Sequence, residues 1–326
     1  MGPFEHLQAL VAQDMDAVNT LIRTRMASKH APRIPEVTAH LVEAGGKRLR
    51  PLLTLAAANI CGYQGTHHQL LAATVEFIHT ATLLHDDVVD ESAKRRGRPT
   101  ANLLWDNKSS VLVGDYLFSR SFQLMVETGN MEALGILANA SAVIAEGEVL
   151  QLSAAQDIST TEEIYLQVVR GKTAALFAAA CEVGAVIAEA PDTHAKALLA
   201  YGDALGISFQ IVDDLLDFSG ATATLGKNVG DDFRERKLTL PIILAVAKAN
   251  TGERAFWKRT IEKGEQREDD LAHALQLMNK HGTLSDTRQR ALGWAAEARK
   301  ALTPLPESEL KTVLSELAGF VVSRVV

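Results

Sequence analysis

Apolar residues recur along this chain with the spacing of an α-helix. They stand at positions i, i+3, i+4 and i+7 in one segment after another, and the alternating runs typical of strands are missing. Prolines fall between these segments, and Pro51 and Pro241 stand where first-turn prolines are tolerated. The pattern predicts helices, with uncertain ends, at about 4–27, 36–43, 50–60, 67–91, 108–127, 131–154, 161–170, 172–188, 192–217, 238–249, 252–263, 268–279, 285–302 and 307–325.

Several of the predicted helices are apolar on nearly every side, for example residues 133–145 and 173–181. Helices of that kind lie in the centre of a large bundle rather than on its surface. No Ser/Gly-rich, Pro-rich or low-complexity segment marks a linker. We therefore expect an all-α protein with a single domain, residues 1–326, built as a bundle of more than ten helices.

The composition supports a globular protein with a sizeable core, because 47% of the 326 residues are hydrophobic and 22% are charged. A net charge of −7 gives no general attraction to nucleic acid or anionic membranes. The two cysteines, Cys61 and Cys181, are too few for a disulfide framework or a zinc site. They are expected to be free thiols in a reducing compartment.

Neither a signal peptide nor a membrane span is evident in the pattern of charges. The start, Met1 to His6, lacks a basic flank followed by an apolar core. Residues 51–75 carry no Asp, Glu, Lys or Arg, but Asn, Gln, Gly and His interrupt them. We expect a cytoplasmic protein without an integral membrane segment.

The first chemically informative motif ends a long apolar run. Asp86 and Asp87 are followed by Asp90 and then by Arg95 and Arg96. On a helix, Asp86 and Asp90 project from the same face, roughly 5–6 Å apart at Cβ. Carboxylates that close suit Mg²⁺, which completes its shell with water and substrate phosphate. The arginines could bind the same phosphate, although a lone motif of this kind is usually a solvated acidic helix end.

Earlier on the same predicted helix, Glu76 and His79 form an ExxH, the spacing used by di-iron carboxylate bundles. That site needs two such motifs and two further glutamates. The chain has only this one, so di-iron chemistry is disfavoured.

A second copy of the acidic pattern changes the interpretation. Asp213, Asp214 and Asp217 again end an apolar run. Charged residues are seldom buried without a partner, so two acidic clusters in apolar helices predict a shared ion site in the bundle core. Several divalent cations would be needed to hold up to six carboxylates together, and those cations would attract a polyphosphate.

Basic residues supply the remaining charges that two diphosphates need. Gly45, Gly46, Lys47, Arg48 and Arg50 stand at a glycine turn that opens a helix, where the backbone N–H groups also favour an anion. Further candidates stand elsewhere in the chain: Lys172 with Thr173, Lys227 and Lys237. Each alone would be an ordinary surface lysine.

These motifs resemble the trans-prenyl diphosphate synthases, from about residue 40 to 245 and more loosely to the end. The matching stretches are GGKRLRP at 45–51, FIHTATLLHDDVVD at 77–90, RRG at 95–97, GEVLQL at 147–152, GKT at 171–173, FQIVDDLLDFSG at 209–220, GKNVGDD at 226–232 and KLTLP at 237–241. Within that family the chain is similar to the long-chain enzymes that make octaprenyl to decaprenyl diphosphate for quinone side chains.

The resemblance implies a homodimer and an active site in a central cavity, where the aspartates face one another. It implies three Mg²⁺ ions on the allylic diphosphate, held by Asp86, Asp87, Asp90, Asp213, Asp214 and Asp217. Contacts to the same diphosphate are implied for Arg95, Lys172, Thr173, Gln210, Lys227 and Lys237. The isopentenyl diphosphate site is implied at Gly46, Lys47, Arg50, His79 and Arg96. One departure is Arg236, where many members have glycine, and it puts the local loop shape in question.

The expected reaction needs no protein nucleophile. Mg²⁺ and a ring of Lys and Arg stabilise the departing diphosphate, and the double bond of isopentenyl diphosphate attacks the allylic cation. The proton is expected to leave with the diphosphate, while apolar walls exclude water. The small Ala81 and Thr82, one turn before Asp86, are expected either to let the product grow long or simply to allow close helix packing. Contact with a membrane surface during product release is also conceivable.

Four other interpretations remain open. A class I terpene cyclase also ionises allylic diphosphates, but it needs no second diphosphate site. A shorter-chain farnesyl or geranylgeranyl synthase shares the motifs. A non-catalytic subunit of a heteromeric synthase would have lost some of the aspartates. A helical scaffold would leave both acidic clusters unexplained.

Arg324, in the last predicted helix, is either near the diphosphates or in solvent.

Overall fold

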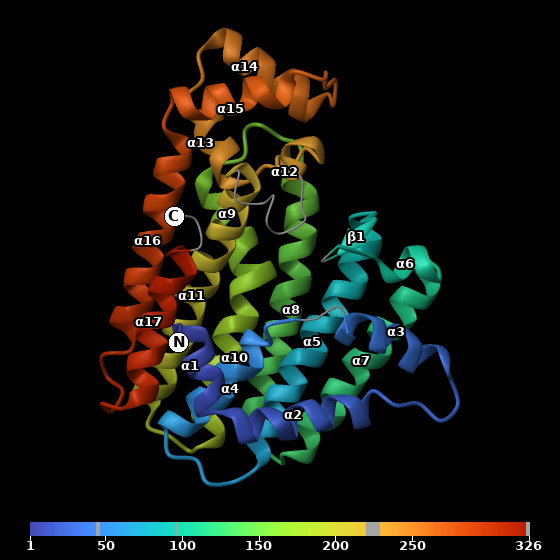
Figure 1. Cartoon of the computed structure of the whole chain (residues 1–326), viewed down its shortest axis with the longest axis vertical. Helices are drawn as coiled ribbons and strands as arrows, with labels where there is room; N and C mark the ends of the chain where they lie inside the picture. The colour runs from blue at the N-terminus through green and yellow to red at the C-terminus, as the bar shows by residue number, and fades with distance from the viewer. Residues whose placement is uncertain (44–45, 96, 220–228, 324–326) are drawn as a thin grey trace. The chain divides into compact units, whose positions relative to one another are not determined.

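The structure is a computed structural model that describes residues 1–43, 46–95, 97–219 and 229–323 (Figure 1). The chain divides into two compact units. Unit 1 comprises Met1–Ser141, Leu176–Gly202 and Leu302–Leu314, and unit 2 comprises Ala142–Ala175, Asp203–Ala301 and Ser315–Val326. The described residues are overwhelmingly helical, which confirms the all-α class. The expectation of a single domain stays a prediction.

Unit 1 is organised around the long helix α5, against which α7, α4 and α2 pack (Figure 1). Its elements before residue 128 are α1 (Pro3–Leu10), α2 (Ala12–Arg25), α3 (Arg33–Glu43), α4 (Leu49–Ile60), α5 (His67–Val89), β1 (Lys94–Arg95), β2 (Arg98–Pro99), α6 (Ala101–Leu104) and α7 (Asn107–Glu127). Residues such as Leu71, Phe77 and Ile78 are fully buried on α5. This burial fixes the orientation of the helix and therefore of the acidic residues at its end.

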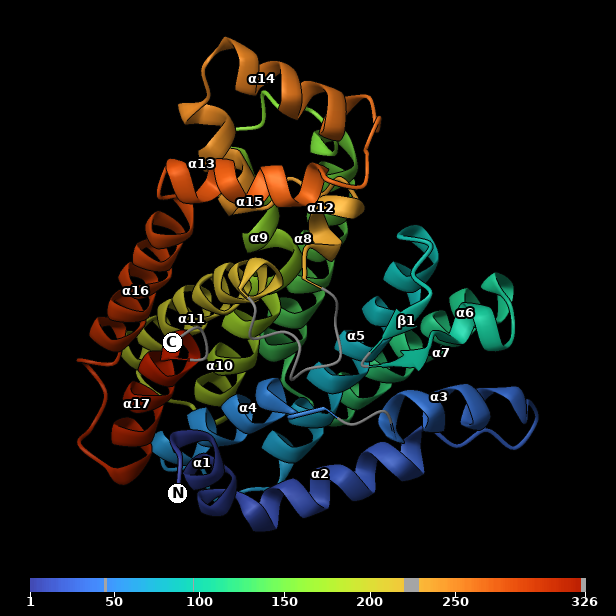
Figure 2. The same cartoon turned by 45° about the horizontal axis from the view of Figure 1, so that its top comes forward.

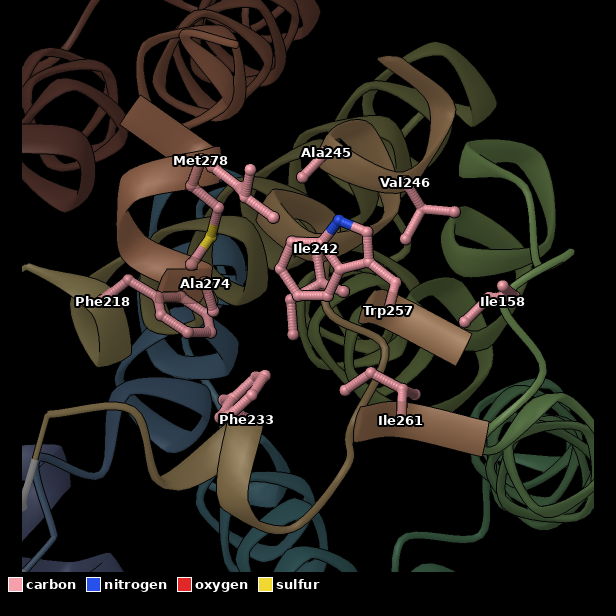
Figure 3. Packing of buried hydrophobic residues seen from close by; sticks show 11 residues of the cluster. Ile158, Phe218, Phe233, Ile242, Ala245, Val246, Trp257, Ile261, Ala274 and Met278 are labelled. Carbon is pink, nitrogen blue, oxygen red and sulfur yellow. The ribbon is translucent and has the colours of Figure 1, made fainter. Parts of the chain in front are cut away.

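Unit 2 has its own apolar core around Trp257 (Figure 3). Ile242 of α13, Phe218 of α11 and Met278 of α15 lie in the same cluster. The remaining elements, some of which contribute to both units, are α8 (Met131–Ala154), α9 (Glu162–Val169), the π-helical turn η1 (Arg170–Ala174), α10 (Ala175–Ile187), α11 (Asp192–Phe218), α12 (Asp231–Arg234), α13 (Leu240–Lys248), α14 (Thr251–Trp257), the π-helical turn η3 (Lys258–Glu262), α15 (Asp270–Lys280), α16 (Thr283–Ala301) and α17 (Glu309–Ser323).

The observed helices follow the predicted ones closely, with three differences. The first predicted helix is broken at Val11, whose φ of −117° and ψ of 20° lie outside the helical region. The helices predicted at 161–170 and 172–188 are joined by η1. The short α6, α12 and the two-residue strands were not predicted, because four residues or fewer carry no detectable periodicity.

Helix α8 is, within the described ranges, the one helix long and apolar enough to cross a membrane. In its most apolar 18-residue window, 28% of the residues are buried in the protein. Buried core helices of globular proteins can pass the same test of length and composition. The absence of an integral membrane segment therefore stays a prediction.

Candidate active site

The first acidic motif lies at the C-terminal end of α5, in unit 1. Asp86 is half-buried in the last turn, and Asp90, the residue after the helix, is exposed. The N–H of Asp90 still donates to the carbonyl oxygen of Asp86 over 2.8 Å, so the predicted i, i+4 relationship holds at the helix end. The neighbouring Asp87 is fully buried and points away from solvent.

A two-stranded hairpin directly after α5 brings Arg95 back onto Asp87. β1 pairs antiparallel with β2, with Lys94 opposite Pro99. Arg95 Nε donates to Asp87 Oδ1 over 2.9 Å, and Nη2 lies 2.7 Å from the same oxygen. Figure 2 shows β1 beside the C-terminal part of α5. The hairpin thus fixes one of the predicted diphosphate contacts beside the acidic motif. Its neighbour Arg96 lies outside the described residues.

The predicted cationic turn opens α4, also in unit 1. Gly46 and Lys47 are exposed. Arg50 stacks over the ring of Phe177 at 4.3 Å from its centroid, and its Nη1 lies 3.5 Å from His79 Nε2. Burial lowers the pKa of Arg50 to about 10, although the charge of Glu76 acts in the opposite direction. The arginine therefore stays protonated at neutral pH.

A small cavity of about 30 Å³ lies where these two groups of residues meet in unit 1. Its lining includes residues of the α4 turn, of α5 and of the hairpin: Gly46, Arg48, Glu76, His79, Asp87 and Arg95. The structure thus brings the first acidic motif and the cationic turn together.

The second acidic motif lies at the end of α11, in unit 2. Asp213 is exposed, whereas Asp214 and Asp217 are buried. Asp217 Oδ2 accepts a hydrogen bond from the backbone N–H of Asp232 over 3.1 Å. Asp232 belongs to α12, so this contact ties the residues after α11 back to the motif.

Hydrogen bonds cap both carboxylate oxygens of Asp214. Tyr165 donates its hydroxyl to Oδ2 over 2.6 Å, and Gln210 Nε2 donates to Oδ1 over 2.8 Å. Burial raises the pKa of Asp214 to about 7, the two hydrogen bonds oppose this rise, and the charge of Asp213 adds to it. Burial and the charges of Asp214 and Asp217 also raise the pKa of Asp232.

The π-helical turn η1 positions Lys172 and Thr173. Single π-turns inside α-helices often occur at functional sites, since they redirect the side chains that follow. Lys172 Nζ lies 3.0 Å from Glu148 Oε2. Thr173 Oγ1 donates to Gln210 Oε1 over 2.8 Å, so Thr173 is connected through Gln210 to Asp214.

Two predicted basic residues follow the second motif. The side chain of Lys237 forms an ion pair of 2.6 Å with Glu235. The backbone N–H of Lys237 donates to the backbone carbonyl oxygen of Asp232. Arg236 has a φ of 58°, a conformation that glycine adopts without strain. At this position the backbone therefore has a shape that suits glycine, although the chain has arginine there. Lys227 and Arg324 lie outside the described residues.

The acidic residues have the right chemistry for a hard divalent cation. Within the described ranges, no group of three or more His, Cys, Asp or Glu side chains is arranged to hold a metal ion. Mg²⁺ needs no such cage, because one or two carboxylates suffice when water and phosphate complete its shell. Asp90 and Asp213 are exposed and Asp86 is half-buried, a placement that fits that manner of binding, whereas the buried Asp87 and Asp214 bind Arg95 and Tyr165.

Sequence reasoning missed two residues that support the site. Tyr165 caps Asp214, and Glu148 pairs with Lys172. Glu148 stands inside one of the stretches that carry the family resemblance. No sequence pattern distinguishes Tyr165 from other apolar-face tyrosines.

Comparison with known proteins places these residues in a family. The family model described as polyprenyl synthetase matches residues 31–278. An octaprenyl diphosphate synthase of Haemophilus influenzae is 44% identical over 320 residues, which cover 98% of this chain and 97% of that protein.

Two solved structures are similar over nearly the whole chain. A decaprenyl diphosphate synthase from Rhodobacter capsulatus is 70% identical, with a TM-score of 0.96 and 99% of both chains covered. A polyprenyl synthase from Caulobacter crescentus, complexed with calcium and isoprenyl diphosphate, is 52% identical, with a TM-score of 0.95; the match covers 100% of this chain and 99% of that one.

Proposed function

Because the chain belongs to the polyprenyl synthetase family, we propose that it is a long-chain trans-polyprenyl diphosphate synthase. It would condense isopentenyl diphosphate repeatedly with an allylic diphosphate primer. The observation that carries the proposal is the cavity of unit 1, where Asp87 and Arg95 lie beside His79 and the α4 turn. A product of octaprenyl to decaprenyl length follows from the names of the similar proteins, and the 70% identity to a decaprenyl synthase favours ten units.

The allylic diphosphate site is assigned to the two acidic motifs and their cationic neighbours. Enzymes of this family depend on Mg²⁺, which acts as a Lewis acid on the leaving diphosphate. Asp86, Asp90 and Asp213 are the best candidates for direct ligands, since Asp90 and Asp213 are exposed and Asp86 is only half-buried. Binding of three ions, with both motifs serving one substrate, is part of the proposal. The cations assigned to the diphosphate are Arg95, Lys172, Lys227 and Lys237, with Thr173 and Gln210 as polar contacts.

The isopentenyl diphosphate site is assigned to the α4 turn. Lys47 is exposed and Arg50 is held in place by Phe177 and His79, so both can present a positive charge to a diphosphate. The N-terminus of α4 adds its unpaired N–H groups. Gly46 lets the chain approach the anion closely, and Arg96 completes the assigned set.

Proton loss in this mechanism falls to the departing diphosphate rather than to a side chain. Asp214, whose pKa burial raises to about 7, is capped by Tyr165 and Gln210 and is not available as a base. The protein residues therefore bind, orient and neutralise charge, while the reacting groups belong to the two substrates.

A homodimer is proposed from the surface of α7 and the start of α8. Exposed apolar side chains gather there on one stretch of unit 1: Val111, Leu112, Phe122, Val126 and Met131. A surface of this kind is better explained by a second copy of the chain than by solvent. A cytoplasmic location, peripheral membrane contact on product release and the absence of nucleic-acid partners complete the proposal.

One assay tests the proposal against the alternatives. Purified protein is incubated with labelled isopentenyl diphosphate, a farnesyl or geranylgeranyl primer and Mg²⁺, with and without a chelator. Long labelled polyprenols that disappear with the chelator are expected. A product stopping at farnesyl or geranylgeranyl length would indicate a shorter-chain enzyme. A released hydrocarbon would indicate a cyclase, and no turnover would indicate a non-catalytic subunit or scaffold.

The same assay can be run on a variant in which one proposed metal ligand is replaced. Asp86→Asn should lower kcat by at least about 100-fold, because transition-state charge loses its metal-mediated stabilisation. Asp16→Asn, on the exposed side of α2, removes the same charge elsewhere and should leave the rate unchanged.

A further inference from the structure

Glu76 is a carboxylate in the middle of α5, and the proposed reaction assigns it no role. On α5 it lies between the fully buried Val75 and Phe77. Its carboxylate is 3.3 Å from Arg48 Nη1, and the two side chains are only 14% and 17% exposed. Removing a charge from water is costly, and a buried ion pair seldom adds net stability. Because burial of this pair costs free energy of desolvation, we explain it by the residues that it holds in position.

The partner, Arg48, stands at a strained point of the backbone. It precedes the first residue of α4 and has a φ of 46° and a ψ of 38°. This left-handed conformation is uncommon for a residue other than glycine and persists only where surrounding contacts enforce it. The ion pair with Glu76 connects the Arg48 side chain to α5.

The strained residue also sets the geometry of the anion site. Arg48 lies directly between Lys47 and the first turn of α4, which carries Arg50. Rotation of φ and ψ at this residue would therefore change where Lys47 points relative to Arg50. The charge of Glu76 also acts on Arg50 directly, since it opposes the lowering of that residue's pKa by burial.

Glu76 and Arg48 both line the same cavity as His79 and Gly46. Their ion pair thus lies beside the proposed isopentenyl diphosphate site rather than in a separate part of unit 1. Of the three cations of the turn, Arg48 is paired with Glu76. Lys47 and Arg50 are therefore the two assigned to binding the substrate.

From these contacts we infer that Glu76 is a positioning residue for the diphosphate of isopentenyl diphosphate. Its carboxylate holds Arg48 in the left-handed conformation that aligns Lys47 and Arg50. The inference rests on the proposed function and adds to it a residue that does not itself touch the substrate.

The first test removes the charge of Glu76 and keeps its size. Glu76→Gln should raise the KM for isopentenyl diphosphate about tenfold, while kcat at saturation and the KM for the allylic primer change less than about threefold. The affinity for isopentenyl diphosphate alone, measured by calorimetry with the folded protein, should fall by the same factor. Glu76→Asp, which keeps the charge, should recover part of the loss. Glu127→Gln breaks the exposed Arg25–Glu127 pair of the same unit and should change neither constant.

The second test separates a backbone effect from a loss of charge. Glycine adopts the left-handed conformation without strain and alanine does not. Arg48→Gly should therefore bind isopentenyl diphosphate more tightly than Arg48→Ala, and Glu76→Gln should cost less affinity when position 48 is glycine. Equal affinity of the two position-48 variants would overturn the inference.

The outcomes also distinguish this inference from the proposed function. If the unaltered protein forms no polyprenyl product, the proposed function itself is wrong. If it forms product and Glu76→Gln keeps the normal KM for isopentenyl diphosphate, only the positioning role is wrong. A fall in kcat with an unchanged KM would also overturn that role.

Discussion

Arg95 binds Asp87 through two nitrogens that share one carboxylate oxygen, with Nε at 2.9 Å and Nη2 at 2.7 Å from Oδ1. The pair is asymmetric, because the carboxylate of Asp87 is fully buried while the side chain of Arg95 is 29% exposed. Arg95 lies eight positions after Asp87, in the first strand of the hairpin. The contact therefore anchors the chain that leaves α5 and holds a diphosphate-binding candidate beside the acidic motif.

This asymmetry predicts which partner is costlier to remove. Arg95→Ala would leave a buried charge without its partner and should lower the free energy of unfolding by roughly 3–5 kcal/mol. Asp87→Ala would leave a cation that can reach water and should cost less, about 1–3 kcal/mol. Urea unfolding of both variants measures the difference. Arg25→Ala, in an exposed pair, should cost no more than about 1 kcal/mol. The opposite order of Arg95→Ala and Asp87→Ala would contradict the interpretation.

Asp214 should make stability depend on pH in the metal-free protein. Its pKa is raised to about 7 in the folded state, mainly by burial, from an ordinary value of 3.8. At a pH between these two pKa values, Asp214 therefore holds a proton in the folded protein that it has lost in the unfolded chain. As a result, stability falls as pH rises from about 4 to about 7 and changes no further above that range.

The matched variant for this effect is Asp214→Asn, which cannot titrate. In a chelator, unfolding by urea at pH 5 and pH 7.5 should show a larger loss of stability for the unaltered protein than for the variant. The two losses of stability should differ by more than about 1 kcal/mol, which is the free energy that corresponds to a shift of a little less than one pKa unit. Tyr165→Phe removes a hydrogen bond that lowers the pKa of Asp214 and should move the transition to higher pH. Identical pH dependence in the unaltered protein and Asp214→Asn would rule out this carboxyl as the source.

The sequence predicted much of this architecture because its information is periodic. The apolar spacing located α5 and α11, and the i, i+4 rule correctly related Asp86 to Asp90. It could not show that Asp87 binds Arg95, since that contact depends on a hairpin too short to have a pattern of its own. The Tyr165 contact to Asp214 joins residues 49 positions apart and arises only from tertiary packing.

Product length gives a prediction for Ala81. Its side chain is fully buried on α5, five residues before Asp86. Ala81→Phe should shorten the polyprenyl product, read by chromatography after removal of the diphosphate, and Ala81→Val should give an intermediate length. The added ring can also overpack the core, by about 1–3 kcal/mol. Thermal unfolding of each variant therefore accompanies the assay. Unchanged product length in a folded Ala81→Phe protein would show that this alanine serves helix packing alone.

The approach of α8 to η1 gives a test of how Lys172 is positioned. A Cβ added at Gly171 would lie 2.7 Å from Gly147 Cα and 3.1 Å from the carbonyl oxygen of Val143. Both are backbone atoms, so the clash cannot be relieved by a side-chain rotation. Gly171→Ala must therefore separate η1 from α8, and with it Lys172 from Glu148. We expect a loss of stability of about 1–3 kcal/mol and a higher KM for the allylic primer.

The matched control is Gly135→Ala, in the same helix as Gly147. A Cβ at Gly135 meets no atom within 4 Å. That substitution should stabilise the protein by up to about 1 kcal/mol, because alanine is the better helix former, and should leave the KM unchanged. Thermal unfolding and steady-state kinetics of the two variants measure both effects. If Gly171→Ala behaved like Gly135→Ala, close contact between α8 and η1 would not be what positions Lys172.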